Sequence, residues 1–364
     1  MRQFVRFATR LYADNPCYVP DLEPDIYDFF DPRKNAGLAF SDVQAFLAYN
    51  DKGKVVGRIA GIINRHANEK WHTRNARFGF IEFINDPDVA AALLGTVEQW
   101  GRERGMDTVQ GPMGIFDFDK EGMLVEDFDQ VGTIITLYNP PYYPRYVEAL
   151  GYEKEVDWVQ IQVNIPPQVP AKYERVARLS KEMFGLHTRK LTRKEVMRDG
   201  YGQKVFRLLN EAFSPLFGFT EIPDRQIEAY IRQYFPFIDL DMVSIVENEA
   251  DELIGVAITL ASLSDAFRKT RGRLFPFGWF HLLRALKGKP SDKAELFLIA
   301  VRPDHQGLGV NALFFDDLIP IYNKKGIRWA ETGPQLEDNV KELSQWKPLE
   351  PKFVKRRRCY KKRI

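Results

Sequence analysis

The sequence contains little cysteine and no long apolar run. Its 364 residues include only Cys17 and Cys359, which stand at opposite ends of the chain. Two distant cysteines do not make a disulfide framework and are typical of a reducing compartment. No apolar stretch reaches the length of a transmembrane helix, and the first residues lack the apolar core of a secretory signal. We therefore expect a cytoplasmic protein with no membrane span.

A strong net charge and metal-ligand spacing are also absent. The net charge is only +2, so the field of the whole molecule gives no reason to expect nucleic acid as a partner. With 45% hydrophobic and 28% charged residues, the composition is that of a globular protein, and the length suffices for two domains. We predict no metal site, because no ligand spacing links the five histidines, His66, His72, His187, His281 and His305.

The most informative stretch of the chain is Glu295–Asn311. Its apolar, partly β-branched run Leu296–Val301 predicts a buried strand. The glycine-bearing turn His305–Asn311 follows, and a helical pattern starts directly after it. The first N–H groups of such a helix have no intrahelical partner and carry the positive end of the dipole, and glycines let a ligand approach the backbone. This pattern predicts an anion site suited to a pyrophosphate.

Two common phosphate loops do not fit this turn. No Lys-Ser/Thr pair follows the glycines, which excludes a Walker A loop, and the Rossmann fingerprint with its acidic residue is missing. The turn Gln306-Gly307-Leu308-Gly309-Val310-Asn311 instead resembles the Q/R-x-x-G-x-G/A loop with which GNAT acyltransferases bind acyl-CoA. Asn311 departs from that pattern, because the family usually has Gly or Ala there. A tight strand-to-helix turn without a ligand is the alternative.

The resemblance to tandem GNAT proteins covers nearly the whole chain. Each half shows a hairpin, a strand, a helix and further strands in the order typical of that family. Since the family's first strand would precede the first helix, the resemblance implies a shortened N-terminus. Five more stretches are similar to an uncharacterised bacterial subgroup: 15–22, 55–68, 138–146, 272–279 and 336–339.

The predicted fold is α/β (α+β), with two tandem GNAT-like modules that each contain a mixed, mainly antiparallel sheet flanked by helices. Residues 1–164 form a degenerate first module, because Asn85-Asp86-Pro87-Asp88 replaces the loop and its two acidic side chains disfavour a pyrophosphate. Residues 165–170 include three prolines and make a stiff linker. Residues 171–364 form the second module, with the acyl-CoA loop and an insertion at 261–293.

The resemblance implies an N-acyltransferase. It would transfer an acyl group, acetyl by default, from acetyl-CoA or another acyl-CoA directly to a small-molecule or peptide amine. The pantetheine arm would lie where the strand at 295–301 separates from the strand at 328–332. The implied binding residues are Ile299, Ala300, Val301, Gln306, Gly307, Leu308, Gly309, Val310, Asn311 and Asn339. For Asn339, a helix cap is the alternative.

The implied chemistry requires a base that removes a proton from the amine. Glu331 is our first candidate, Glu337 the second and Glu295 the third, and a salt bridge or a helix cap is the alternative for each. In the family a tyrosine often protonates the leaving thiolate. Trp346 stands near that place in this sequence, and an indole cannot act as this acid.

Other functions remain open at this point. A peptidyltransferase of related fold would take aminoacyl-tRNA through the basic stretch 352–363, for which we prefer a solvated edge strand. A non-catalytic acyl-CoA-binding protein is the second alternative. The aromatic and basic stretch 272–289 suits a lid over an acyl or lipid-like substrate, a homodimer contact or core packing.

Overall fold

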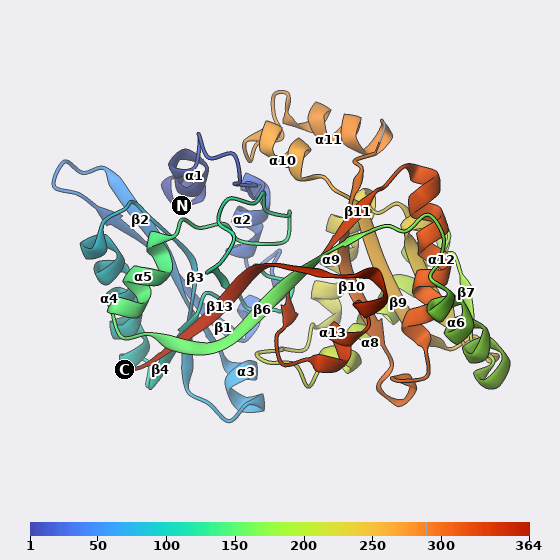
Figure 1. Cartoon of the computed structure of the whole chain (residues 1–364). Coiled ribbons are helices and arrows are strands. Elements are labelled where there is room, and N and C mark those ends of the chain that lie inside the picture. The colour runs from blue at the N-terminus through green and yellow to red at the C-terminus, as the bar shows by residue number, and fades with distance from the viewer. Residues whose placement is uncertain (289) are drawn as a thin grey trace.

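Two lobes stand side by side and share one continuous sheet (Figure 1). The computed structural model describes residues 1–288 and 290–364; Lys289, which belongs to the predicted insertion, lies outside the described residues. Within those two ranges the sheet has thirteen strands, with the main order β1-β2-β3-β4-β13-β6-β11-β10-β9-β8-β7. This mixed, mainly antiparallel sheet flanked by helices confirms the predicted fold class.

The first lobe is built on strands whose two faces are both covered. In β2, Ile59 packs into the cluster under α4, whereas the next residue, Ala60, packs against α1 on the opposite face, as the alternation of a strand requires. The elements of residues 1–164 are α1 (Arg2–Leu11), α2 (Glu23–Phe29), β1 (Ser41–Tyr49), β2 (Val55–Asn64), α3 (Arg65–Lys70), β3 (Asn75–Phe83), α4 (Pro87–Arg102), β4 (Thr108–Gly111), β5 (Met123–Leu124), α5 (Tyr142–Ala149) and β6 (Glu153–Asn164).

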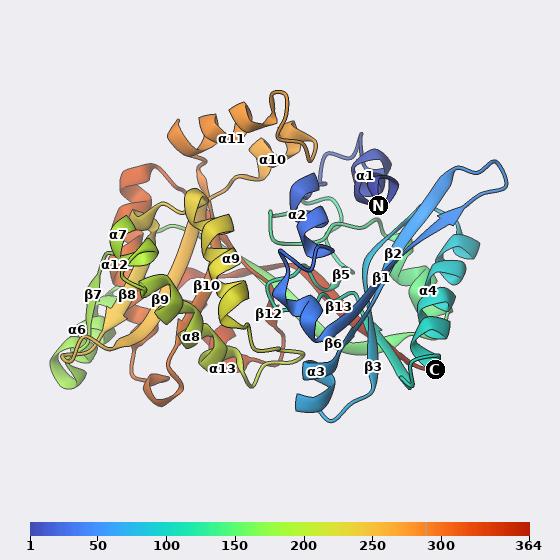
Figure 2. The same cartoon turned by 180° about the vertical axis from the view of Figure 1, so that it is seen from behind.

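The second lobe repeats this layering. Helix α12 packs with α6 over one face of the sheet, and α8 lies against β9 and β10 on the other face (Figure 2). Its elements are α6 (Ala171–Phe184), β7 (His187–Arg189), α7 (Arg193–Met197), α8 (Tyr201–Phe213), α9 (Asp224–Tyr234), β8 (Val243–Glu247), β9 (Leu253–Ala261), α10 (Ser264–Thr270), α11 (Gly278–Lys287), β10 (Lys293–Val301), α12 (Val310–Lys325), β11 (Trp329–Thr332), β12 (Gln335–Leu336), α13 (Val340–Ser344) and β13 (Lys352–Arg363).

The two lobes exchange strands. The last strand, β13, lies between β4 and β6 and pairs antiparallel with both. Strand β6 in turn pairs with β11 of the second lobe. The predicted boundary at 165–170 therefore separates the modules in the sequence only. In space, β13 from the second half of the chain lies between two strands of the first half. The expectation of a solvated edge strand at 352–363 is wrong, because β13 is central and Lys355 and Arg357 are each 1% exposed.

Buried acidic groups match the cations of β13. Lys355 Nζ lies 2.5 Å from Glu331 Oε1, and Lys293 Nζ of β10 lies 2.7 Å from Glu331 Oε2. Arg358 of β13 is matched by the neighbouring strand β6, where Asp157 Oδ1 lies 2.8 Å from Arg358 Nε. A buried charge is tolerated only when it is paired and hydrogen-bonded, so these contacts explain how so basic a segment enters the sheet.

The proline-rich segment between the modules is docked on the second lobe. The N–H of Ile165 donates to the carbonyl of Arg328 at 2.8 Å, and Asn323 Nδ2 donates to the carbonyl of Pro166 at 2.8 Å. Val169 packs against the core of the second lobe. These contacts hold the start of α6 beside α12. No helix in the described part of the chain is long and apolar enough to cross a bilayer.

Candidate functional site

Strands β10 and β11 separate part-way along their length. They pair in parallel only over Lys293–Leu296 of β10, although β10 continues to Val301. The N–H of Gly333 donates to the carbonyl of Leu296 at 2.9 Å, and beyond this bond the chain after β11 turns toward β6. On its other side β10 stays paired with β9 as far as Val301. The β10 backbone after Leu296 therefore presents an edge to the gap between the strands, which can receive an extended ligand.

The glycine turn places the start of α12 beside this gap. Gly309 is the N-cap with φ +83°, and no side chain caps the helix. A Cβ on Gly309 would lie 2.3 Å from Ser180 Oγ, so this glycine is required for packing against α6. Gly307 has φ +86° and open space where a Cβ would stand. The first N–H groups of α12 thus carry no competing side-chain acceptor.

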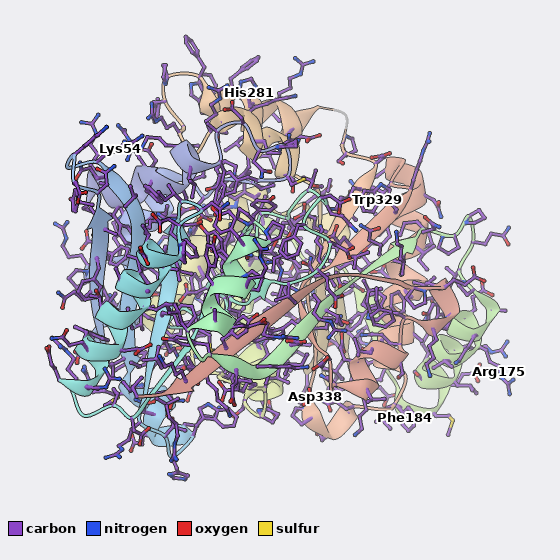
Figure 3. The ribbon with its side chains drawn as sticks, turned by 60° about the vertical axis from the view of Figure 1, so that its left-hand side comes forward. Lys54, Arg175, Phe184, His281, Trp329 and Asp338 are labelled. Atoms are coloured by element: carbon purple, nitrogen blue, oxygen red, sulfur yellow. The ribbon has the colours of Figure 1, made fainter. Side chains whose placement is uncertain are left out.

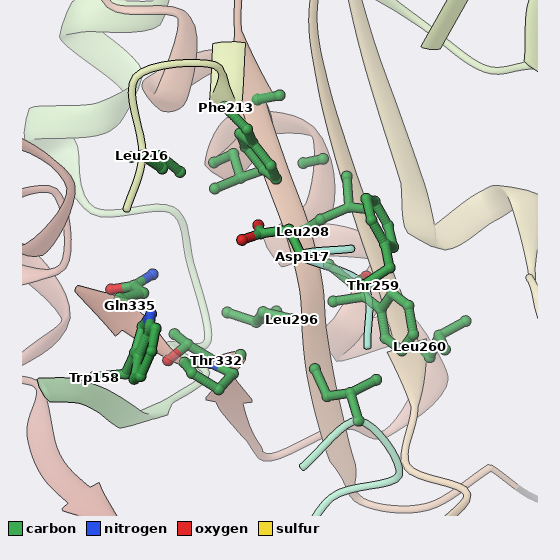
Figure 4. Close-up of a pocket in the computed structure, with 18 of the residues that line it drawn as sticks. Asp117, Trp158, Phe213, Leu216, Thr259, Leu260, Leu296, Leu298, Thr332 and Gln335 are labelled. Atoms are coloured by element: carbon green, nitrogen blue, oxygen red, sulfur yellow. The ribbon is translucent and has the colours of Figure 1, made fainter. Parts of the chain in front are cut away.

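One cavity of about 1960 Å³ joins the turn to the strand gap. Figure 4 shows Leu296 and Leu298 of β10, Thr332 of β11 and, from the first lobe, Asp117 and Trp158 around it. The walls thus come from both lobes. Much of the lining is apolar, with Phe213, Leu216, Phe217, Phe237, Leu260, Phe267, Leu274 and Phe297 among the contributing residues.

The first lobe adds carboxylates to this cavity. Asp117, Asp119 and Glu121 line it. Burial raises the pKa of Asp117 and of Asp119 to about 6, even though Arg77 nearby acts in the opposite direction. Asp119 also accepts the N–H groups of Ile115 and Phe116, which holds its loop in place. Burial and the charge of Asp117 raise the pKa of Glu121 well above its usual value, so the negative charge that suits a cationic group of a ligand comes from Asp117 and Asp119.

The chain is similar in sequence to known bacterial proteins over most of its length. No protein-family model matches the chain. It is 26% identical to Protein YghO of Escherichia coli K12, over 100% of this chain and 93% of that protein. It is 28% identical to a protein of Caulobacter vibrioides named Bacterial ceramide synthase, over 84% of this chain and 79% of that protein.

Solved structures cover the chain from end to end. A tandem GNAT protein from the clavulanic acid biosynthesis pathway superposes with a TM-score of 0.53 at 14% identity, over 100% of this chain and 95% of that one. A GCN5-related N-acetyltransferase from Sphaerobacter thermophilus gives 0.51 at 13% identity, over 100% and 93%. The chain has the tandem GNAT fold. The order of elements expected from the resemblance is thereby confirmed.

The first GNAT module has the same strand gap, but side chains fill it. Strand β3 pairs with β4 in parallel only over Asn75–Arg77, although β3 continues to Phe83. Tyr143 is 0% exposed and stacks on Phe83, and its hydroxyl accepts the N–H of Phe83 at 2.7 Å. The Tyr142 hydroxyl donates to the carbonyl of Phe83 at 2.9 Å. The motif NPPYYPRY thus supplies the tyrosines that occupy the backbone groups that stay open in the second module.

The helix starts of the two modules differ in the same sense. In the first module, Asp86 is the N-cap of α4, and its carboxylate accepts the N–H of Asp88 at 2.9 Å. In the second module the N-cap Gly309 has no side chain to offer. The first helix therefore binds its own anion, whereas the start of α12 is left for an external one.

Most of the predicted binding residues meet in the cavity. Leu308 is absent from the lining, and its carbonyl accepts the hydroxyl of Ser180 at 2.7 Å. Asn339 lines the cavity and also caps α13, because its Oδ1 accepts the N–H of Glu342 at 3.3 Å. The remaining predicted residues that line the cavity are Ile299, Ala300, Val301, Gln306, Gly307, Gly309, Val310 and Asn311.

An acyl-CoA fits these residues. The uncapped start of α12 suits its pyrophosphate, and the open edge of β10 suits the amide groups of pantetheine. The amide oxygen Oδ1 of Asn311 is buried and, within the described part of the chain, has no hydrogen-bond partner. A donor on a bound ligand would satisfy it, because a buried acceptor without a partner is costly. Asn311 is thus compatible with a ligand at this loop.

The three carboxylates that the sequence suggests as bases lie outside this cavity. Burial alone would raise the pKa of Glu331, but the charges of Lys355 and Lys293 outweigh it and hold that pKa below its usual value. Glu337 pairs with Lys154 and Arg356 at the surface. Glu295 accepts the hydroxyls of Ser262 and Ser264 behind the strand. These environments fit structural ion pairs and hydrogen bonds better than proton transfer.

Glu342 is the carboxylate that the sequence reasoning missed. It lines the cavity, and burial raises its pKa to about 7. The side chain of Gln335, three residues after the end of β11, donates to Glu342 Oε1 at 3.1 Å. Trp346 Nε1 donates to the other end of the Gln335 amide at 3.1 Å, so indole, amide and carboxylate form a chain. In the described part of the structure Glu342 forms no salt bridge.

One further group of ligand-type side chains lies away from the cavity. His187, Glu247 and Asp251 bring ligand atoms within 4.8 Å of one another. Glu247, however, already accepts Arg189 Nε at 2.6 Å and the Tyr201 hydroxyl at 2.5 Å. Its charge is therefore matched by Arg189.

Proposed function

We propose that the protein is an N-acyltransferase that uses acyl-CoA and acts in the second module. The carrying observation is that the uncapped start of α12 and the open edge of β10 face one cavity. The first module acts as a scaffold and contributes the acidic wall around Asp117. This wall attracts the ammonium form of the amine acceptor.

The reaction is a direct transfer. The amine nitrogen attacks the thioester carbonyl, an N–C bond forms, and the C–S bond breaks. The products are an amide and the free thiol of CoA, so one proton leaves the nitrogen and one proton reaches the sulfur. Donors on the backbone of β10 would hold the thioester in place beside the separating strands.

Glu342 is the base that we assign to this step. It faces the cavity, and no cation neutralises it in the described structure. Gln335 holds the carboxylate, and Trp346 in turn holds Gln335, so the group is oriented by two hydrogen bonds in series. A carboxylate whose pKa lies near the working pH both accepts and returns a proton readily. Trp346 is then a positioning residue.

The volume of the cavity favours a substrate with a long alkyl chain. Its 1960 Å³ exceeds the roughly 300–1,000 Å³ of ordinary ligand pockets, and aromatic and aliphatic side chains form much of its wall. The relative from Caulobacter is named a ceramide synthase, and a ceramide is the amide of a fatty acid with a long-chain amino alcohol. We therefore replace the default acetyl donor with a long-chain acyl-CoA, and we propose a long-chain amine as acceptor.

Affinity should rise with the length of the acyl chain. Each buried CH₂ contributes about 0.8 kcal/mol, so octanoyl-CoA should bind at least roughly tenfold more tightly than acetyl-CoA even if few of its methylenes are buried. Calorimetric titration with CoA, acetyl-CoA and octanoyl-CoA measures this. Equal affinities for the three ligands would rule out the long-chain donor and leave acetyl transfer in place.

The loop is tested by Asn311→Asp. The change keeps the shape of the side chain, and an acidic residue at the start of a helix favours the helix. Because Asn311 Oδ1 is buried without a partner, the free energy of unfolding of the variant is measured alongside, so that loss of binding is scored on folded protein. The added charge faces the expected pyrophosphate, and we predict that the Kd for CoA rises by roughly tenfold or more. The measurement is calorimetric titration with CoA.

The matched control is Asn50→Asp. Asn50 lies in the exposed turn between β1 and β2, where its Oδ1 accepts the N–H groups of Lys52 and Lys54, and a carboxylate can accept both. The control should bind CoA as the wild type does. If both variants bind like the wild type, CoA does not contact this loop.

The two alternatives make different predictions. An aminoacyl-tRNA enzyme was expected to bind its RNA through the basic stretch 352–363, but the cations Lys355 and Arg357 of that stretch are buried inside the sheet. A non-catalytic binder would take up acyl-CoA without releasing thiol in the presence of amines. A thiol-release assay with long-chain primary amines therefore separates the proposed enzyme from a binding protein.

A further inference from the structure

The helices α10 and α11 project from the body of the protein above the space between the two lobes (Figures 1 and 2). Helix α11 and the loop that joins it to α10 carry an unusual concentration of exposed apolar side chains. Phe275 is 77% exposed, Phe277 74% and Phe280 51%. Trp279, Leu283 and Leu286 are also exposed. We call these six side chains the aromatic face.

Along α11 the exposed apolar side chains lie next to the ones that hold the helix to the protein. Leu282 is 5% exposed and packs into a cluster with Leu22 and Phe267. Trp279, Leu283 and Leu286 follow one another at the i, i+4, i+7 spacing of a single helix side. The helix thus has a broad apolar stripe, of which the edge at Leu282 is buried and the part with Trp279, Leu283 and Leu286 is exposed.

The segment that carries the aromatic face is also strongly basic. Residues 264–288 contain six basic residues, Arg268, Lys269, Arg271, Arg273, Arg284 and Lys287, and one acidic residue, Asp265, which gives a net charge of +5. Arg268 pairs with Asp265 and Arg273 with Glu23. Between residues 264 and 288, Lys269, Arg271, Arg284 and Lys287 take part in no salt bridge of the described structure.

Exposed aromatic side chains on a strongly basic segment are typical of a surface that inserts shallowly into an anionic bilayer. A second copy of the chain fits less well, because a symmetric contact would bring two such positive faces together. We propose that the aromatic face docks on an anionic lipid surface. The same segment reaches the cavity, because Phe267 and Leu274 line the cavity and the exposed Phe275 directly follows Leu274 in the chain.

The experiment is vesicle flotation with the full chain, without acyl-CoA or amine. Vesicles of phosphatidylcholine alone are compared with mixed phosphatidylcholine–phosphatidylglycerol vesicles. We expect the wild type to float with the mixed vesicles only, and less at high salt. The double variant Phe275→Glu/Phe280→Glu removes two exposed aromatics and adds two negative charges, and its vesicle affinity should fall at least about tenfold.

The matched control is Met183→Glu/Phe184→Glu on α6. Met183 is 67% and Phe184 42% exposed, and Phe184 lies far from His281 of α11 (Figure 3). This control should bind vesicles as the wild type does. Three outcomes would overturn the proposal: a wild type that ignores anionic vesicles, equal losses in both double variants, or a dimer in sedimentation that only the Phe275/Phe280 variant dissociates.

Vesicle binding is measured without any substrate, so its failure leaves the acyl transfer untouched. The reverse also holds, because a protein that docks on vesicles but releases no thiol would contradict only the proposed function. With a short-chain, water-soluble donor and acceptor, the Phe275→Glu/Phe280→Glu variant should turn over at the wild-type rate, since neither side chain lines the cavity.

Discussion

Glu342→Gln is expected to reduce kcat/KM by about 100-fold or more, because the variant loses the group that accepts the proton of the amine. Glutamine keeps the size of the side chain, so CoA binding and the free energy of unfolding should stay close to wild type. The assay is thiol release from octanoyl-CoA with a long-chain amino alcohol as acceptor. The change should appear in kcat more than in KM, since Glu342 is assigned to the chemical step.

The pH profile separates a base from a merely structural residue. Because burial raises the pKa of Glu342 to about 7, kcat/KM of the wild type should fall as the pH drops below that value. This limb should vanish in Glu342→Gln and persist in Glu342→Asp. The matched control is Glu337→Gln, a nearby carboxylate outside the cavity. A Glu342→Gln enzyme with wild-type rate and pH profile would remove Glu342 from the mechanism.

Glu331→Gln is expected to lower the free energy of unfolding by about 3–5 kcal/mol, because it leaves Lys355 and Lys293 buried without their counter-charge. Lys355 is 1% exposed, so water cannot replace the carboxylate. A loss of this size is a large share of the stability of an ordinary domain. Chemical denaturation measures it.

The pH dependence of this loss has a definite sign. The pKa of Glu331 is held below its usual value, so the ion cluster stabilises the fold above the ordinary carboxyl pKa near 4.5 and fades as the pH falls through the lower, folded pKa. The difference in free energy of unfolding between the wild type and Glu331→Gln should therefore be largest near neutral pH and should shrink in acid.

The surface carboxylate Glu337 provides the comparison for this effect. It pairs with Lys154 and Arg356, and its side chain is 33% exposed. Exposed ion pairs contribute about 0–1 kcal/mol, so Glu337→Gln should hardly shift the denaturation midpoint. If Glu331→Gln is equally mild, the buried cluster does not hold β13 in the sheet.

Local structure could largely be predicted from the sequence. Helix α6 at Ala171–Phe184 follows from its own apolar spacing and from the glycine directly after it. The hairpin of β8 and β9 and the strand–turn–helix at 295–325 were equally clear. Each of these signals is contained in a short stretch of chain.

The place of β13 could not be predicted in this way. Its partners, β4 and β6, are separated from it by roughly 190 to 250 residues, and pairing over such distances leaves no local periodicity. A run of lysines and arginines normally indicates a solvated strand. Only the structure shows that Glu331 and Asp157 lie inside the sheet and pair with those charges.

In the candidate site, too, one part could be predicted from the sequence and another could not. The glycine turn is a local motif, and its position at the start of α12 agrees with the prediction. Glu342 could not be recognised as a site residue, because Asn followed by Glu three residues later is typical of a capping box, in which the glutamate only caps the helix. In the structure the N–H of Asn339 binds Leu336 instead, which frees the Glu342 carboxylate for Gln335.

The first module shows why a missing motif is informative only together with the fold. The acidic residues at 85–88 predict a lost anion site, and Asp86 indeed caps its own helix. The tyrosines that fill the strand gap stand out in the sequence as part of the motif NPPYYPRY. Their contact with Phe83 could not be predicted, because Phe83 is about 60 residues away in the chain. The filled gap supports a scaffold role for this module.

The central claim is one acyl-CoA site per chain, in the second module. The most direct measurement is the stoichiometry of CoA binding to the wild-type protein by calorimetric titration. The account predicts saturation at one CoA per chain, because Tyr142, Tyr143 and Asp86 occupy the corresponding positions of the first module. Folded protein that binds no CoA, or that binds two per chain, would contradict it.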